Sequence, residues 1–209
     1  MHRLLPAPES IENVTSRTAP VFVVTGQSGA GKGTLIKRLL ERFRQLALAV
    51  SATTRSIRPG EVDGVHYYFI SDEEFDRRLA ADEFLEHHEF PWGQRSGTLV
   101  SEIDRIQAGG SVPLLELETE GALNVAERVP GAITIFVTAP LPELERRLRE
   151  RATESAGEIE ERVRVAQEQL QVAGRFDYAI ENDELGRAAN DLAAIVKREL
   201  EAAATMSER

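Results

Sequence analysis

A glycine-rich segment with a single lysine is the part of this sequence whose residue types most directly suggest chemistry. It reads Gly26-Gln27-Ser28-Gly29-Ala30-Gly31-Lys32-Gly33-Thr34, between an apolar run and a segment with apolar residues at helical spacing. Glycines allow backbone N–H groups to turn toward an anion, and a helix N-terminus adds partial positive charge. Lys32 would then reach the β- and γ-phosphates. We therefore predict that residues 26–34 bind the phosphates of ATP.

The alternative for this segment is a glycine-rich turn with an incidental lysine, which the strand–turn–helix context disfavours. The position after Lys32 usually carries a Ser or Thr that ligates Mg²⁺, but here it is Gly33, and Thr34 comes one residue later. This ending resembles that of adenylate kinases, in which phosphates and water hold most of the magnesium. We expect a weak or water-mediated contact between the loop and Mg²⁺.

A second group of residues suggests a site for another phosphate. Arg55 and Arg58 follow an apolar run, three residues apart, and Tyr67 follows a turn that contains Gly64. Two guanidinium groups and a phenol can converge on one phosphate through charge-assisted hydrogen bonds. Two solvated surface arginines would explain the same pattern. Taken alone, the segment leaves both explanations open.

The whole of segment 51–69 resembles the guanylate kinase family, whose members carry Ser-x-Thr-Thr-Arg-x-Pro-Arg-x-Gly-Glu followed by Gly, Tyr and Phe. The likeness covers residues 20 to about 200. It implies a P-loop kinase that transfers the γ-phosphoryl group of ATP to GMP or dGMP, with Mg²⁺ as the cofactor of ATP. The further segments that carry it are 71–75, 83–86, 93–98, 147–151, 160–166 and 176–183.

The resemblance also implies roles for individual residues. Glu86 matches the carboxylate that accepts hydrogen bonds from guanine N1 and N2, donors that adenine lacks. The full set implied to bind GMP is Ser51, Arg55, Arg58, Tyr67, Glu86, Thr98 and Glu118. The set implied to be catalytic is Lys32, Arg55, Arg147, Arg151 and Arg162, and no side chain is assigned as a direct metal ligand.

Several positions depart from the family pattern and leave the acceptor open. Ser96 replaces a tyrosine that contacts the phosphate in the family, and we expect neighbouring Arg95 to supply the missing donor. Glu118 replaces the usual Asp, and Ile57 replaces the proline between the two arginines. One alternative function is a kinase for another small phosphorylated acceptor, such as a sugar phosphate. Another is a non-catalytic guanylate-kinase-like binding module, although such modules usually lose the phosphate loop.

The elements that must position these residues alternate between strands and helices, which favours an α/β fold with a central parallel sheet wrapped by helices. Residues 60–97 differ and predict a small α+β insert that binds the monophosphate, with a short helix capped by Ser71 and Glu74.

We predict an N-terminal arm at 1–19 and one domain at 20–209. Its parts are a core at 20–59 and 98–209, the insert, and a lid at about 151–158. The expected core strands are 21–24, 46–50, 112–117 and 133–137; the insert strands are 65–70 and 84–90; the helices lie around 121–129, 141–151, 158–172 and 185–203.

Composition narrows the classes of partner and location. Asp and Glu number 35 against 25 Lys and Arg, a net charge of −10, which disfavours a nucleic acid polymer as partner. No apolar run approaches the roughly 18 residues that span a membrane. Cysteine is absent, which excludes disulfides and thiolate metal sites and fits a cytoplasmic location.

His87 and His88 are expected on opposite faces of a strand, so they do not suggest a metal site. The C-terminal alanine-rich helix is expected to serve packing or a homo-oligomer surface.

Overall fold

The computed structural model describes residues 20–90, 92–150 and 156–207. Its main sheet has five strands in the order β2-β7-β1-β8-β9, and every neighbouring pair is parallel. The expectation of a central parallel sheet is therefore confirmed. The strands are β1 (Val21–Gly26), β2 (Leu46–Leu48), β7 (Val112–Glu116), β8 (Ala132–Thr138) and β9 (Tyr178–Glu181).

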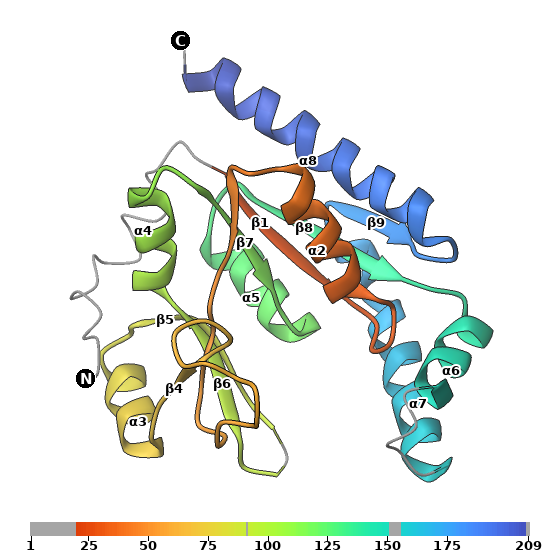
Figure 1. Ribbon diagram of the computed structural model, residues 1–209, viewed down its shortest axis with the longest axis horizontal. Coiled ribbons are helices and arrows are strands. Elements are labelled where there is room, and N and C mark those ends of the chain that lie inside the picture. Colours follow the sequence, from red (N-terminus) through yellow and green to blue (C-terminus); the bar gives the residue numbers. More distant parts are fainter. Residues whose placement is uncertain (1–19, 91, 151–155, 208–209) are drawn as a thin grey trace.

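The central strand β1 is buried on both faces, because side chains of successive residues point to opposite sides of the sheet. Phe22 and Val24 belong to one core cluster, which α2 (Lys32–Arg42) and α8 (Leu185–Ser207) cover. Val21 and Val23 belong to the other, beneath α4 (Val100–Ala108) and α5 (Thr119–Arg128). Figure 1 shows these helices wrapping the sheet. The alanine-rich helix α8 packs on the sheet through Ala188, Leu192, Ala193 and Val196, all buried.

A second, four-stranded sheet in the order β4-β3-β6-β5 forms the insert. Helix α3 (Asp72–Ala80) covers it, and Phe75 stacks on Phe84 with ring centroids 4.4 Å apart in the small core. Ser71 caps α3 as predicted, since its hydroxyl accepts a hydrogen bond from the backbone N–H of Glu74 at 3.2 Å. The strands are β3 (Ala52–Thr53), β4 (Tyr68–Phe69), β5 (Phe84–Glu89) and β6 (Arg95–Leu99).

The insert differs from its sequence-based prediction in extent. Its sheet includes β3 at 52–53 and continues to Leu99, so it exceeds the expected 60–97 at both ends. The strand expected at 65–70 is reduced to residues 68–69. This strand lies at the edge of the sheet and its neighbour β3 is only two residues long, so the ladder ends early.

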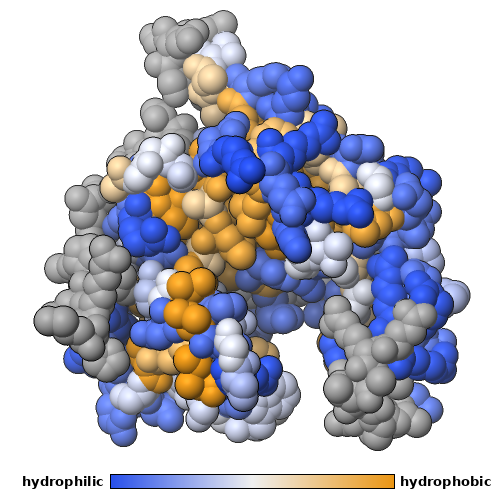
Figure 2. All heavy atoms as spheres, viewed as in Figure 1, coloured by the Kyte–Doolittle hydropathy of each residue, from blue (hydrophilic) through white to orange (hydrophobic). Residues whose placement is uncertain are grey.

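The helices α6 (Leu141–Glu150) and α7 (Ala156–Gln171) form a lobe beside the sheet and join its first core cluster through Leu144 and Ala166. A 3₁₀ turn follows at Ala173–Arg175. Of the predicted lid, residues 156–158 begin α7 and residues 151–155 lie outside the described part, as does the predicted arm at 1–19. The molecule is hollowed between this lobe and the insert (Figure 2). None of the helices in the described ranges combines the length and apolarity that crossing a membrane requires.

Candidate functional site

The predicted phosphate loop joins β1 to α2, and its backbone has the conformation that glycine allows. Gly26, Gly29 and Gly31 have φ values of 139°, 84° and 88°, a region that other residues rarely adopt. A Cβ atom on Gly26 would lie 1.9 Å from the carbonyl oxygen of Val137. Lys32 folds back over the loop, and its Nζ donates to the carbonyl oxygens of Gly26 at 2.8 Å and Gln27 at 3.3 Å. Thr34 lies exposed in the first turn of α2.

Gln27 belongs to the predicted ATP-binding loop, but its side chain is fully buried. It forms hydrogen bonds that link the loop to α7 and to the end of β8. Its Nε2 donates to the carbonyl oxygen of Ala166 at 2.8 Å, on α7. Its Oε1 accepts from the backbone N–H of Ala139 at 3.0 Å and from the hydroxyl of Thr138. All these bonds are internal, and the backbone N–H of Gln27 also donates to the carbonyl oxygen of Val137 at 3.0 Å, so Gln27 supports the loop.

Two of the predicted catalytic arginines contact the loop directly. Arg162 on α7 donates to the hydroxyl oxygen of Ser28 at 2.8 Å. Arg147 on α6 donates to the carbonyl oxygens of Ala30 at 3.3 Å and Asn182 at 2.9 Å. Both are therefore placed at the predicted phosphate site. Arg151 lies outside the described residues.

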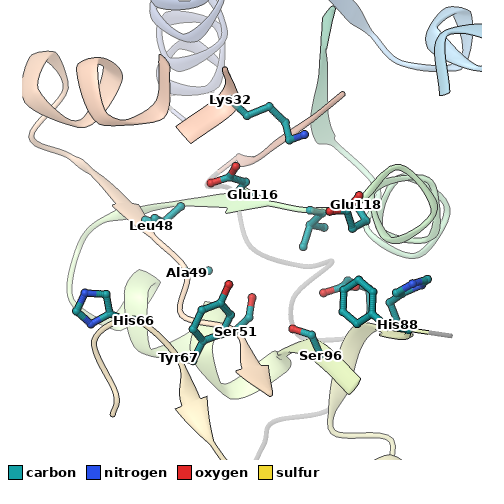
Figure 3. A pocket seen from close by; sticks show the side chains of 13 residues that line it. Lys32, Leu48, Ala49, Ser51, His66, Tyr67, His88, Ser96, Glu116 and Glu118 are labelled. Carbon is teal, nitrogen blue, oxygen red and sulfur yellow. The ribbon is translucent and has the colours of Figure 1, made fainter. Parts of the chain in front are cut away.

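A cavity of about 310 Å³ connects this loop to the insert. In Figure 3, Lys32 and Glu116 lie on one side, and Ser51, Tyr67, Ser96 and His88 come from the insert side. Of the sequence-predicted residues, the cavity brings together Lys32, Ser51, Tyr67, Glu86 and Glu118. Its remaining lining residues are Leu48, Ala49, His66, His88, Phe90, Ser96, Glu116 and Leu117.

Glu86 on β5 is a buried carboxylate at the floor of this cavity, with 6% of its surface exposed. It accepts a hydrogen bond from the backbone N–H of Thr98 at 2.9 Å. A Cβ atom on Gly121 would lie 2.6 Å from Glu86 Oε2, so the carboxylate is packed against the first turn of α5, where the helix dipole favours negative charge. Burial raises the pKa of Glu86, and the hydrogen bonds from Thr98 and the proximity of His88 oppose this rise.

Arg55 and Arg58, the predicted phosphate ligands, do not line the cavity. Arg55 donates to both carboxylate oxygens of Glu61, at 2.7 and 2.5 Å, and its guanidinium lies 4.8 Å from the centroid of the Tyr67 ring. Tyr67 does line the cavity, so Arg55 is one aromatic ring away from it. Arg58 is exposed, and its backbone N–H donates to Glu61 at 2.8 Å. Hydrogen bonds from Arg55 and then Arg58 lower the pKa of Glu61 to about 2.

Two site features were missed from the sequence. Glu116 ends β7 and lines the cavity with Lys32 and Glu118. The surrounding protein excludes bulk water and raises the pKa of Glu116; the charge of Lys32 opposes this, and that of Glu118 adds to it. Its position, at the carboxyl end of the strand beside β1, is where ligands bind in parallel sheets. The other is Gly121, where a glycine within a helical pattern signals a close approach.

The expectation that Arg95 replaces the missing tyrosine donor is wrong. Its guanidinium donates to Asp72 at 2.8 Å and to the carboxylate of Asp76, and lies 4.6 Å from the centroid of the Phe75 ring. These contacts hold it on α3. Within the described ranges, no three or more His, Cys, Asp or Glu side chains are grouped to hold a metal ion.

Comparisons with known proteins agree with this geometry. The family model described as guanylate kinase matches residues 18–199. The chain is 47% identical to a guanylate kinase of Synechococcus elongatus, over 84% of this chain and 96% of the relative, and 44% identical to one of Desulfitobacterium hafniense, over 86% and 90%. The crystal structure of guanylate kinase from Anaplasma phagocytophilum superposes with a TM-score of 0.68 at 27% identity, covering 87% of this chain and 86% of that one. With the phosphate loop and the acceptor cavity in one molecule, this chain belongs to the guanylate kinase family.

Proposed function

We propose that this protein transfers the γ-phosphoryl group of ATP to GMP or dGMP, giving ADP and the diphosphate. The observation that carries the proposal is that Lys32 of the phosphate loop and the buried carboxylate of Glu86 line one cavity. A lysine on a glycine-rich loop suits the donor triphosphate. A buried carboxylate suits the N1–H and N2–H donors of guanine, and it would be left unpaired by adenine.

On the acceptor side, Glu86, Thr98 and Ser51 would hold the base. The acceptor phosphate would bind Tyr67, Arg55 and Arg58. Since Arg55 is bound to Glu61 in this structure, it must exchange that carboxylate for the incoming phosphate. Its guanidinium lies 4.8 Å from the centroid of the Tyr67 ring, which lines the cavity, so it is close to the proposed phosphate position.

On the donor side, an oxygen of the acceptor phosphate attacks the γ-phosphorus, and the bond to the β-phosphate oxygen breaks. No general base is required, because the attacking oxygen is already anionic. Lys32, Arg147 and Arg162 would stabilise the charge on the transferring group, as cations do in phosphoryl transfer, with Arg151 in the same role by family resemblance. The insert and segment 151–158 would close toward the core and exclude water; an X-ray scattering profile unchanged by a bisubstrate analogue would contradict this closure.

The site also fits the magnesium that accompanies ATP. Glu116 and Glu118 place carboxylates in the cavity that Lys32 also lines, and Mg²⁺ prefers oxygen ligands, usually one or two carboxylates together with phosphates and water. These two side chains would hold the ion directly or through water. When bound, it would neutralise charge on the β- and γ-phosphates.

The test is an assay of ADP release across GMP, dGMP, AMP, CMP and UMP. The highest kcat/KM with GMP or dGMP would support the proposal, and a higher value with another nucleotide would remove the guanine assignment. Turnover of a phosphorylated non-nucleotide alone would favour the second candidate, a kinase for another small acceptor, for which Ser96 is the motivating residue. A non-catalytic binding module is disfavoured by the intact loop around Lys32. Homo-oligomerisation, a cytoplasmic location, and the lack of nucleic acid and membrane partners stay predictions.

A further inference from the structure

Two titratable side chains of the insert line the cavity without a role in the family resemblance or the proposed function: His66 and His88. His66 is exposed, and its Nδ1 accepts a hydrogen bond from the backbone N–H of Val62 at 3.0 Å. The residue closer to the base site is His88, on the edge strand β5. It lies two residues after Glu86, so the two side chains point to the same face of the sheet. Its neighbour His87 points to the other face, toward the rings of Phe75 and Phe84.

The strand register places His88 between the base and phosphate ends of the acceptor site. Glu86 pairs with Thr98, and His88 pairs with Ser96, which in turn pairs with Thr53 on β3. Arg55 follows Thr53 by two residues along the chain. His88 therefore lies two residues along the strand from Glu86, a distance of about 7 Å. It is displaced from Glu86 in the direction of Arg55.

At this position His88 is the longer member of its cross-strand pair. The Ser96 hydroxyl donates to the carbonyl oxygen of Ala52 at 3.1 Å, so this short side chain is held on the sheet. Directly opposed side chains have Cβ atoms about 5 Å apart, close enough for the imidazole of His88 to occupy the space above Ser96. Ser96 is also where the family resemblance leads one to expect a tyrosine.

The surroundings of His88 orient its ring. Its Nδ1 lies 3.6 Å from the carboxylate of Glu120 on α5, and its ring meets that of Phe90 edge-on at 4.7 Å. The other charged groups lining the cavity are Glu86, Glu116, Glu118 and Lys32. With Nδ1 turned toward Glu120, the Nε2 atom is the one left to bind a ligand.

We propose that His88 is an acceptor-binding residue that hydrogen-bonds the sugar–phosphate part of the nucleoside monophosphate. The proposal rests on the proposed function, because it assumes that the monophosphate occupies this cavity. A sugar hydroxyl can both donate and accept, and a phosphate accepts, so either protonation state of the imidazole can make the bond. His88 then contributes affinity for any nucleoside monophosphate, whereas Glu86 selects the base.

The test compares the KM values for GMP and ATP of wild type, His88→Ala and the matched control His87→Ala. One hydrogen bond of about 1.4 kcal/mol corresponds to about a tenfold change. We expect His88→Ala to raise the KM for GMP about tenfold, with kcat and the KM for ATP within about twofold of wild type. His87→Ala should leave all three unchanged, since its side chain faces away from the cavity. Equal KM values for GMP in the two variants would overturn the proposal.

A second readout separates contact with the ligand from a general loss of structure. Trp92, the one tryptophan of the chain, stacks on Phe90 at 5.0 Å, and Phe90 contacts His88. Saturation with GMP should therefore change tryptophan fluorescence in wild type and His87→Ala. The change should be lost in His88→Ala at GMP concentrations that calorimetry shows to be saturating; its full retention would count against a contact at His88.

Failure of the proposed function would be distinguishable from failure of this inference. If wild type prefers another nucleotide, the guanine assignment fails, but the ratio of KM values between His88→Ala and wild type for that nucleotide still tests His88. If wild type turns over no acceptor, the comparison is made on calorimetric dissociation constants for GMP. A ratio near one in either case rejects the role of His88.

Discussion

Replacing Glu86 by glutamine should lower activity toward GMP while making the protein more stable. The substitution keeps the size of the side chain and one oxygen that can accept from the backbone N–H of Thr98, a 2.9 Å bond in the wild type. It turns the other oxygen into an N–H donor. That donor would face the N1–H and N2–H donors of guanine.

The size of the loss follows from the bond that disappears. A hydrogen bond to a charged group contributes about 1.5–3 kcal/mol, and here a repulsive donor–donor contact replaces it. A total of about 3 kcal/mol corresponds to a fall of about 150-fold in kcat/KM for GMP. The KM for ATP should stay within about twofold of wild type, because Lys32 and its loop are untouched.

The gain in stability follows from the raised pKa of the buried carboxyl. Because the folded-state pKa lies above the unfolded value, the native protein holds this proton more tightly than the unfolded chain. Stability is therefore lost as the pH rises from the unfolded pKa through the folded one, and the cost is complete once the pH exceeds the folded-state pKa. Each pH unit by which burial raises the pKa of Glu86 destabilises the folded protein by about 1.4 kcal/mol. The Glu86→Gln substitution removes this destabilisation.

Urea unfolding of both proteins between pH 4 and 8, with GMP kinetics at each pH, measures the two effects together. The difference in unfolding free energy should grow with pH, and the wild-type KM for GMP should rise as the pH falls through the raised pKa, where the carboxyl gains a proton. A Glu86→Gln variant with wild-type kcat/KM for GMP would refute the assignment of Glu86 to the base. A variant less stable than wild type at pH 7 would refute the argument from burial.

Three further substitutions test other parts of the site. Lys32→Ala should lower kcat by about a hundredfold or more and leave the melting temperature within a few degrees; wild-type turnover would contradict its role at the donor phosphates. Gly121→Ala should raise the KM for GMP by about tenfold and spare that for ATP, since the new Cβ would lie 2.6 Å from Glu86 Oε2; equal shifts in both KM values would argue against this contact. Gln27→Ala should lower the urea-derived free energy of unfolding by about 2–4 kcal/mol, because it leaves buried groups such as the Ala139 N–H unpaired; a loss below about 1 kcal/mol would show that water replaces the amide.

Local sequence determined the elements whose geometry depends on near neighbours. The strand β1, the glycine loop and the start of α2 follow from an apolar run, three glycines that adopt positive φ, and helical spacing. The cap of α3 by Ser71 depends on a residue three positions away. The glycine-rich motif indicated Lys32 and the family resemblance indicated Glu86, and the structure brings both to one cavity.

Tertiary structure alone decided which partners the charged and polar side chains have. Arg95 binds α3 rather than the cavity, Arg55 pairs with Glu61, and His88 faces Ser96 across two strands. The contact between Gly121 and Glu86 joins a helix to a strand 35 positions earlier in the chain. A long polar side chain has many accessible rotamers and several nearby partners of similar energy, so the packing of distant segments selects among them, and no local pattern in the sequence records that choice.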